Sequence, residues 1–427
     1  MGNIYYQHIE ITDFGPYITK LTLAMPRPVK ESELPENAFN VYVEILGKNG
    51  RQIMVPKDFL HRDEFLPSRG YRPVLKAYPS DINGTPLAES GYVTLELPYG
   101  PLYPCCSAIS ADFTNINGHE YYTVSNYRIT QLATIGEGKE ALAGLVFDSC
   151  AGVFNPDRDL FLEDVSHHPV TPLRYGYFVP PIDTGKKPLI VWLHGAGEGG
   201  QETAISYTGN KVPALAKPAI QDKFGGAFIF SPQCPTMWLD DGSMTYGATG
   251  KSIYVESLKF AIDEFISRFA GAIDTDRIYV GGDSNGGFMT MRMILDYPDF
   301  FAAAFPICEA LFDDTIPDEK IRAIKDLPIW FTHAKDDPIV PPAKTVVPTY
   351  NRLLAAGAKK VVFTFWDGIY DMHGLFKDAN GNPWHYMGHF AWIPVLNNDC
   401  KVDFDGQPVV CDGRELDLFD WIALQHK

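Results

Sequence analysis

Three short segments of the sequence carry residue types that together could attack a carbonyl carbon. Ser284 lies in the run GDSNG (282–286), Asp337 in DDPIV (336–340), and His389 follows Gly388. A serine hydroxyl becomes a nucleophile when a histidine takes its proton and a carboxylate holds that histidine in the right tautomer. The sequence therefore predicts a nucleophile at Ser284, a base at His389 and an acid at Asp337.

The residues around Ser284 indicate how its hydroxyl would be presented. An apolar β-type run (277–280) precedes it, and a helix-type apolar pattern (288–295) follows. A serine on such a sharp strand-to-helix turn is strained, and side chains two positions away would collide, so glycine fits there. We expect a nucleophile elbow, with the backbone N–H of Asn285 directed at a developing oxyanion. The alternative is a glycine-rich loop with an incidental serine, and the flanking elements argue against it.

A second glycine-rich loop follows a near-continuous apolar run (188–193), which is typical of a strand buried in a parallel sheet. The loop, HGAGEGG (194–200), predicts Ala196 as the second oxyanion donor. Its glycines also match a dinucleotide-binding pattern. That interpretation needs a helix directly after the loop and an acidic residue ending the next strand, and the sequence shows neither. We therefore expect no cofactor.

The acid and the base each have neighbours that could replace them. Asp336 precedes Asp337. In hydrolases with a serine, a histidine and an acid in this order, the acid typically stands three residues before a valine, here Val340, which selects Asp337. His373 and His385 compete with His389, which the preceding glycine and the predicted C-terminal helix (415–425) favour. The order Ser, Asp, His is the order of the α/β-hydrolases. Two other histidines, His194 and His333, are expected to brace the loops that contain them.

Two further residues, Gln233 and Trp238, are predicted to bind substrate, with simple packing as the alternative for Trp238. No metal site is expected. The run Asp378 to Asn382 begins like a calcium loop but has Pro383 where glycine is obligatory, and it is predicted to be a turn. The seven cysteines show no C-x-x-C pair. Cys400 and Cys411 form either a disulfide or two buried thiols.

Length and composition limit the class of protein. The chain has 427 residues, enough for two domains, and 45% of them are hydrophobic. Its net charge of −17 argues against nucleic acid or an anionic membrane as partner, and no apolar run reaches 18 residues. The first six residues have neither a basic region nor an apolar one, so we expect no signal peptide here.

Two regions differ in pattern. In residues 1–150, short alternating runs are separated by turn clusters, which predicts an all-β, antiparallel sandwich. In residues 151–427, buried-type strands alternate with helical segments such as 255–269 and 343–356, which predicts a catalytic domain of the α/β class. A connector rich in Pro, Gly and His is expected within 148–172.

These motifs resemble those of bacterial esterases that carry an N-terminal immunoglobulin-like domain on an α/β-hydrolase, related to polyhydroxybutyrate-depolymerase-like and feruloyl-esterase-like enzymes. The resemblance is carried by FGPYITK (14–20), YRPV (71–74), LHGAGE (193–198), PQCP (232–235) and DRIYVGGDSNGG (276–287). It implies a serine carboxylesterase. The alternatives are a polyester, feruloyl or acetyl polysaccharide esterase, a serine peptidase, or a polymer-binding protein with residual hydrolase activity. One departure is the inserted segment 367–387.

The same resemblance sets expectations for partners and location. We expect a small-molecule or polymeric ester as substrate, with no nucleic acid and no membrane as partner, and homo-oligomer formation stays open. A secreted or periplasmic location is expected, with a cytoplasmic one as the alternative.

Overall fold

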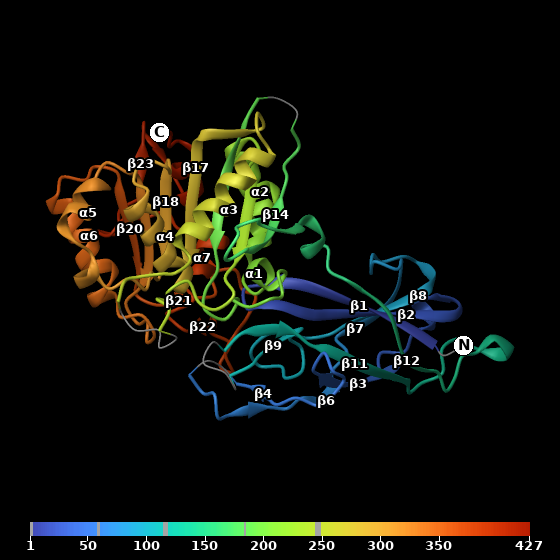
Figure 1. Ribbon diagram of the computed structural model, residues 1–427. Coiled ribbons are helices and arrows are strands. Elements are labelled where there is room, and N and C mark those ends of the chain that lie inside the picture. The colour runs from blue at the N-terminus through green and yellow to red at the C-terminus, as the bar shows by residue number, and fades with distance from the viewer. Residues whose placement is uncertain (1–2, 58–59, 114–117, 183–184, 244–248) are drawn as a thin grey trace. The chain divides into compact units, whose positions relative to one another are not determined.

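The computed structural model describes residues 3–57, 60–113, 118–182, 185–243 and 249–427. The chain divides into two compact units, Met1–Asp159 and Leu160–Lys427 (Figure 1). Strand β12 (Val146–Phe154) pairs with strands of the first unit, so its sheet continues beyond residue 150. The short helix η3 (Arg158–Leu160) lies at the division. Each unit is described by itself below.

The first unit is built on one eight-stranded sheet in the order β6-β3-β11-β12-β1-β2-β8-β7. Besides β12, its strands are β1 (Asn3–Thr12), β2 (Gly15–Lys30), β3 (Phe39–Leu46), β6 (Arg69–Arg72), β7 (Lys76–Ser80), β8 (Glu89–Glu96) and β11 (Val124–Gln131). Smaller elements are the pair β4 (Val55–Pro56) and β5 (Phe65–Leu66), the pair β9 (Ile109–Ala111) and β10 (Glu120–Tyr122), and the helices η1 (Glu31–Glu33) and η2 (Gly138–Glu140).

The alternation seen in the sequence explains the core of this unit. Along β3, every second residue from Phe39 to Ile45 is buried, and β11 alternates in the same way. The expectation of antiparallel pairing throughout was wrong at one place, because β1 and β12 run parallel. Strand β12 runs antiparallel to its other neighbour, β11, and this pairing sets the direction of β12 relative to β1. An alternating sequence pattern predicts a strand but does not predict the direction of the strand beside it.

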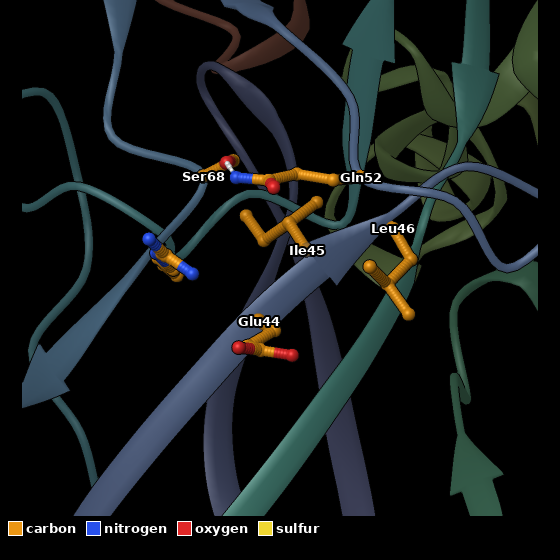
Figure 2. A pocket seen from close by; sticks show the side chains of 6 residues that line it. Glu44, Ile45, Leu46, Gln52 and Ser68 are labelled. Atoms are coloured by element: carbon orange, nitrogen blue, oxygen red, sulfur yellow. Dashed lines mark hydrogen bonds between the residues drawn. The ribbon is translucent and has the colours of Figure 1, made fainter.

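A small recess of about 40 Å³ lies beside the end of β3 and is lined by Glu44, Ile45, Leu46, Gln52, Ser68 and Arg69. Figure 2 shows the Gln52 amide donating to the Ser68 hydroxyl across it, at 3.3 Å. Pockets that bury small organic ligands measure roughly 300–1,000 Å³. This recess is therefore too small to receive an ester substrate.

A buried arginine ties several strands of the first unit together. The Arg72 side chain donates to the Tyr127 hydroxyl at 2.6 Å and to the carbonyl oxygens of Ile18 and Pro98 at 3.0 and 2.7 Å. Arg72 is only 4% exposed, so a side chain without donors would leave three buried acceptors unpaired.

We predict that Arg72→Met lowers the free energy of unfolding of the first unit by about 3 kcal/mol, since each lost buried bond costs about 1–3 kcal/mol. Denaturant unfolding of the whole chain, followed by hydrogen exchange in β3 and β11, measures the effect. Arg128→Met is the matched control. Its exposed side chain makes only a 3.8 Å ion pair with Asp148, so its loss should change stability by less than about 0.5 kcal/mol. Equal effects of the two substitutions would contradict the account.

The second unit has an eight-stranded sheet in the order β13-β14-β16-β15-β17-β18-β19-β20. Its strands are β13 (Leu162–Val165), β14 (Arg174–Phe178), β15 (Lys187–Leu193), β16 (Phe228–Gln233), β17 (Ile273–Asp283), β18 (Ala303–Ile307), β19 (Ile329–Ala334) and β20 (Val361–Trp366). From β16 to β20 every neighbouring pair is parallel, whereas β14 is antiparallel to both of its neighbours.

Helices cover this sheet, and α4 packs on β17 and β18 (Figure 1). The helices are α1 (Ile205–Thr208), η4 (Val212–Ala216), α2 (Pro218–Phe224), α3 (Val255–Arg268), α4 (Asn285–Asp296), η5 (Asp313–Thr315), α5 (Asp318–Ala323), η6 (Pro342–Lys344), α6 (Val346–Ala355), α7 (Trp392–Leu396) and α8 (Leu418–Ala423). Two short hairpins complete the unit: β21 (Ile369–Tyr370) with β22 (His385–Tyr386), and β23 (Val410–Cys411) with β24 (Arg414–Glu415).

The buried strands coincide with the apolar runs of the sequence, and every residue of β15 and β19 is buried. The last helix is shorter than the predicted 415–425. It begins only after Asp417, whose side chain accepts a hydrogen bond from the Asp420 N–H and caps the helix. Among the described residues, no helix is both long and apolar enough to cross a membrane.

Candidate active site

Ser284 stands between the end of β17 and the start of α4, with φ 55° and ψ −114°. This is a strained backbone conformation for a residue that is not glycine. Its N–H donates to the Ile307 carbonyl at 2.9 Å, and its own carbonyl accepts from the Phe288 N–H at 2.8 Å. The Ser284 side chain makes no cap bond to the helix, so its hydroxyl can take part in other contacts.

The glycines on either side of Ser284 allow the elbow to pack on backbone. A Cβ at Gly282 or at Gly286 would overlap the carbonyl oxygen of Leu193, the last residue of β15. A Cβ at Gly287 would lie only 2.5 Å from the Ile307 carbonyl oxygen. The elbow therefore fits between the ends of β15 and β18 only without these side chains.

The structure brings the three predicted residues into one line. His389 Nε2 lies 2.8 Å from Ser284 Oγ, and His389 Nδ1 lies 2.8 Å from Asp337 Oδ2. Since a carboxylate only accepts, Nδ1 carries the ring proton, and the bare Nε2 is left to accept from the serine hydroxyl. Asp337 comes from the loop after β19, and His389 from the segment before α7.

The Asp337 carboxylate is buried and accepts hydrogen bonds on both oxygens. Oδ2 lies 2.8 Å from His389 Nδ1 and 3.0 Å from His333 Nε2, while Oδ1 accepts from the N–H groups of Ile339 and Val340 at 2.8 and 3.0 Å. Burial alone raises the pKa of Asp337, but the bonds from His333, His389 and the Val340 N–H outweigh it. The pKa therefore lies well below its ordinary value. The group is an anion at neutral pH.

The competing residues have other partners. Asp336 Oδ2 pairs with His385 Nε2 at 3.0 Å, and the His385 side chain is half exposed. His373 Nε2 pairs with Asp399 Oδ2 at 2.9 Å, again with a half-exposed imidazole. The inserted segment thus forms the β21–β22 hairpin, and its His385 is held by Asp336 rather than by Asp337.

The two expected oxyanion donors lie in backbone segments that meet at the elbow. The Asn285 N–H is at the first position of α4, where the positive end of the helix dipole favours an anion. Ala196 follows Leu193 and His194, whose carbonyl oxygens a Cβ at Gly286 would approach. No hydrogen bond from either N–H is found within the described parts of the chain.

Side chains hold the loop of Ala196 in place. His194 Nε2 accepts from the Cys234 N–H at 2.9 Å, so Nδ1 carries the proton and donates to the Gly195 carbonyl at 2.6 Å. Nε2 of Gln233 donates to the Glu198 and Glu202 carbonyls at 2.9 and 3.0 Å. His194 thus fastens the loop to the residue after β16, and Gln233 fastens it to the last residue of β16.

The structure buries the two residues that were predicted to bind substrate, Gln233 and Trp238. Gln233 is 1% exposed, and its amide nitrogen is used by the loop carbonyls. Trp238 is completely buried between the rings of His194 and Tyr254, with centroid distances of 5.3 and 6.1 Å. Both side chains support the loop from behind and present no surface to a substrate.

One group with the spacing of metal ligands coincides with the same site. Atoms of Cys308, Asp337 and His389 lie within 4.8 Å of one another. Asp337 Oδ2 already accepts from two imidazole N–H groups, and His389 Nε2 lies 2.8 Å from Ser284 Oγ. Two of the three residues therefore already bind one another and Ser284, and the group belongs to the site described above.

The structure also tests the predictions about the cysteines and about the turn at 378–382. All seven cysteines are free, and Cys400 is buried whereas Cys411 is exposed, so the alternative of a disulfide is not realised. Asp378 accepts from the Asn380 and Asn382 N–H groups at 2.8 and 2.9 Å, which makes this segment the predicted turn.

Two buried ionisable residues of the site region received no chemical role from the sequence. His333 ends a run of buried apolar residues, and Glu198 lies in a glycine-rich loop directly after a buried strand. Their positions beside buried strands indicate that both side chains are buried, which could have marked them as candidate residues of the site. Burial raises the pKa of Glu198 to about 7.

We predict that this carboxyl destabilises the folded chain as pH rises. Between its ordinary value of 4.5 and about 7, the folded state binds more protons at Glu198 than the unfolded state does, so the free energy of unfolding falls. Glu198→Gln removes this dependence, and its stability relative to the unmodified chain should increase across that range. Denaturant titrations at several pH values measure the difference. A difference in stability that does not change with pH for Glu198→Gln would contradict the assignment.

Each of the two units matches a model of a known protein family. Residues 8–143 match the family model described as the esterase Ig-like N-terminal domain, and residues 178–369 match the phospholipase/carboxylesterase family model. The chain therefore combines an Ig-like domain of the esterase type with an α/β-hydrolase domain of the phospholipase/carboxylesterase family. His389 lies beyond the second match.

Curated relatives match part of the chain. Feruloyl esterase B of Neurospora crassa is 33% identical over 138 residues, which are 31% of this chain and 42% of that protein. Poly(3-hydroxyalkanoate) depolymerase C of Paucimonas lemoignei is 33% identical over 137 residues, 30% of this chain and 29% of that protein. The chain thus spans less than half the length of these relatives.

One solved structure matches both units. The crystal structure of a thermostable esterase has a TM-score of 0.73 and 23% sequence identity, and the match covers 99% of this chain and all of that one. At this identity the likeness shows a shared fold.

Proposed function

We propose that this chain is a serine carboxylesterase that hydrolyses carboxylic esters through an acyl-enzyme. The observation that carries the proposal is the unbroken line from Ser284 Oγ through both nitrogens of His389 to Asp337, with 2.8 Å at each contact. A serine at this elbow whose hydroxyl faced no base would be a poor nucleophile.

In the first half-reaction, Ser284 Oγ attacks the ester carbonyl carbon while His389 Nε2 takes the hydroxyl proton. The carbonyl oxygen becomes an oxyanion that the N–H groups of Ala196 and Asn285 would bind. The negative Asp337 carboxylate stabilises the imidazolium and keeps its orientation. The intermediate collapses when the bond to the alcohol oxygen breaks and His389 passes the proton to that oxygen, which leaves the acyl group on Ser284.

In the second half-reaction, His389 takes a proton from a water molecule that attacks the acyl carbon. A second oxyanion forms in the same place. Its collapse returns the proton to Ser284 Oγ and releases the carboxylic acid. The two halves use the same residues, so one preorganised site serves both.

The relatives suggest two substrate classes. One is named as a feruloyl esterase and another as a poly(3-hydroxyalkanoate) depolymerase. We propose that the acyl side is either a feruloyl group or a hydroxyalkanoate unit. Initial rates on feruloyl esters, hydroxyalkanoate oligomers and short p-nitrophenyl esters would distinguish these classes.

We predict that Ser284→Ala, His389→Ala and Asp337→Asn each reduce kcat on p-nitrophenyl acetate by about three orders of magnitude or more, as losses of triad members do. The three effects should not add in a combined variant, because the residues act as one unit.

The matched controls are substitutions in the two neighbouring histidine–aspartate pairs, His385–Asp336 and His373–Asp399. Asp336→Asn, His385→Ala and His373→Ala should keep activity within about tenfold, since their partly exposed ion pairs contribute only about 0–1 kcal/mol. Wild-type turnover by Ser284→Ala would refute the proposed nucleophile. An inactive His385→Ala with an active His389→Ala would assign the base to the inserted hairpin instead.

A further inference from the structure

A second histidine contacts the same carboxylate oxygen as His389. His333, on β19, is completely buried, and its Nε2 lies 3.0 Å from Asp337 Oδ2 and 3.1 Å from the Val340 carbonyl oxygen. Both of these atoms are acceptors, so Nε2 must carry a proton and share it between them.

The other nitrogen of this ring determines its protonation state. His333 Nδ1 is buried and has no hydrogen-bond partner among the described residues. A proton on Nδ1 would be a buried donor without an acceptor, at a cost of roughly 1–3 kcal/mol or more. A bare Nδ1 avoids that cost. His333 is therefore a neutral imidazole with its proton on Nε2, and it is a donor toward Asp337.

Asp337 Oδ2 is thus shared between two imidazole N–H groups. The bond from His333 is strongest when Asp337 has its full negative charge, and it weakens when His389 becomes an imidazolium and neutralises part of that charge. His333 therefore stabilises the resting state, with a neutral His389, more than it stabilises the protonated state. His333 also holds Oδ2 in place beside His389, while two backbone N–H groups hold the opposite oxygen.

We propose that His333 is a positioning residue of the triad, which orients the Asp337 carboxylate and limits how strongly that carboxylate favours the protonated form of His389. This inference deepens the proposed esterase function and rests on it. The ionisable groups that face Asp337 are His333 from β19, His389 from the segment before α7, and the Cys308 thiol after β18. The neighbouring Asp336 is paired with His385.

The test compares three substitutions at one position. In His333→Gln, the amide nitrogen can take the place of Nε2 and keep the donor. His333→Phe keeps a planar ring but has no donor, and His333→Asn is too short to bring its amide to Oδ2. Thermal unfolding of each variant establishes that it is folded, and kcat and KM are then measured from pH 5 to 9.

We expect His333→Phe and His333→Asn to lose about tenfold to a hundredfold in kcat with little change in KM. The reason is that Oδ2 is then no longer held toward His389, and a displacement of about 1 Å in a catalytic group can cost about a hundredfold. The acidic limb of their kcat/KM profiles should move to higher pH, because Asp337 then favours the protonated base more strongly. His333→Gln should recover most of kcat and the original limb. A purely structural role would lower stability without moving the limb.

Failure of this inference can be told apart from failure of the proposed function. If Ser284→Ala retains activity in the same assay, the esterase mechanism itself is wrong. If Ser284→Ala is inactive while folded His333→Phe or His333→Asn keeps wild-type kcat and an unmoved acidic limb, His333 does not position the triad. Should His333→Phe fail to fold, the comparison of the Asn and Gln variants decides. Equal profiles for those two overturn the inference.

Discussion

The elbow at Ser284 depends on backbone packing that leaves no room for side chains. Gly282 and Gly286 both face the carbonyl oxygen of Leu193, and any Cβ there would push β15 away from β17. This close approach holds Ser284 at φ 55° and places the start of α4 against the loop of Ala196. The strained serine and the placement of the two proposed oxyanion donors both follow from the fit of the ends of β15, β17 and β18.

The proposed mechanism also requires that the buried Asp337 carboxylate keep its negative charge. An unpaired carboxylate in this position would be neutralised by protonation, because burial penalises the charged form. Four N–H groups prevent that at Asp337, two from imidazoles and two from the backbone of its own loop. The loop thus serves stability and chemistry together, since the bonds that fold it also keep the carboxylate ionised.

Much of this arrangement was predictable from sequence because it is local. The glycines around Ser284 require a turn, the valine at 340 selects Asp337 over Asp336, and continuous apolar runs identify the parallel strands. The alternating runs predicted that the first unit is all-β, and the resemblance to a family of esterases implied that it is immunoglobulin-like. These features depend on neighbours within a few residues.

What the sequence could not supply depends on contacts between distant segments. The parallel pairing of β1 with β12 depends on the direction of β11, and the burial of Trp238 depends on a histidine forty-four residues earlier. Gln233 was predicted to bind substrate, and its amide nitrogen donates to the Glu198 and Glu202 carbonyls, a pairing that its neighbours in the sequence do not indicate. His333 is a local case by contrast: it was expected to brace its own loop, and it contacts Asp337 and Val340, four and seven residues further along.

In the proposed mechanism, Ser284 is a nucleophile that His389 activates. This role can be measured by incubating the chain with a fluorophosphonate ester and then using intact-protein and peptide mass spectrometry. We expect one adduct per chain, on Ser284, that forms at least about a hundredfold more slowly in His389→Ala, because general-base assistance contributes about that much. An adduct on another residue, or an unchanged rate in His389→Ala, would contradict it.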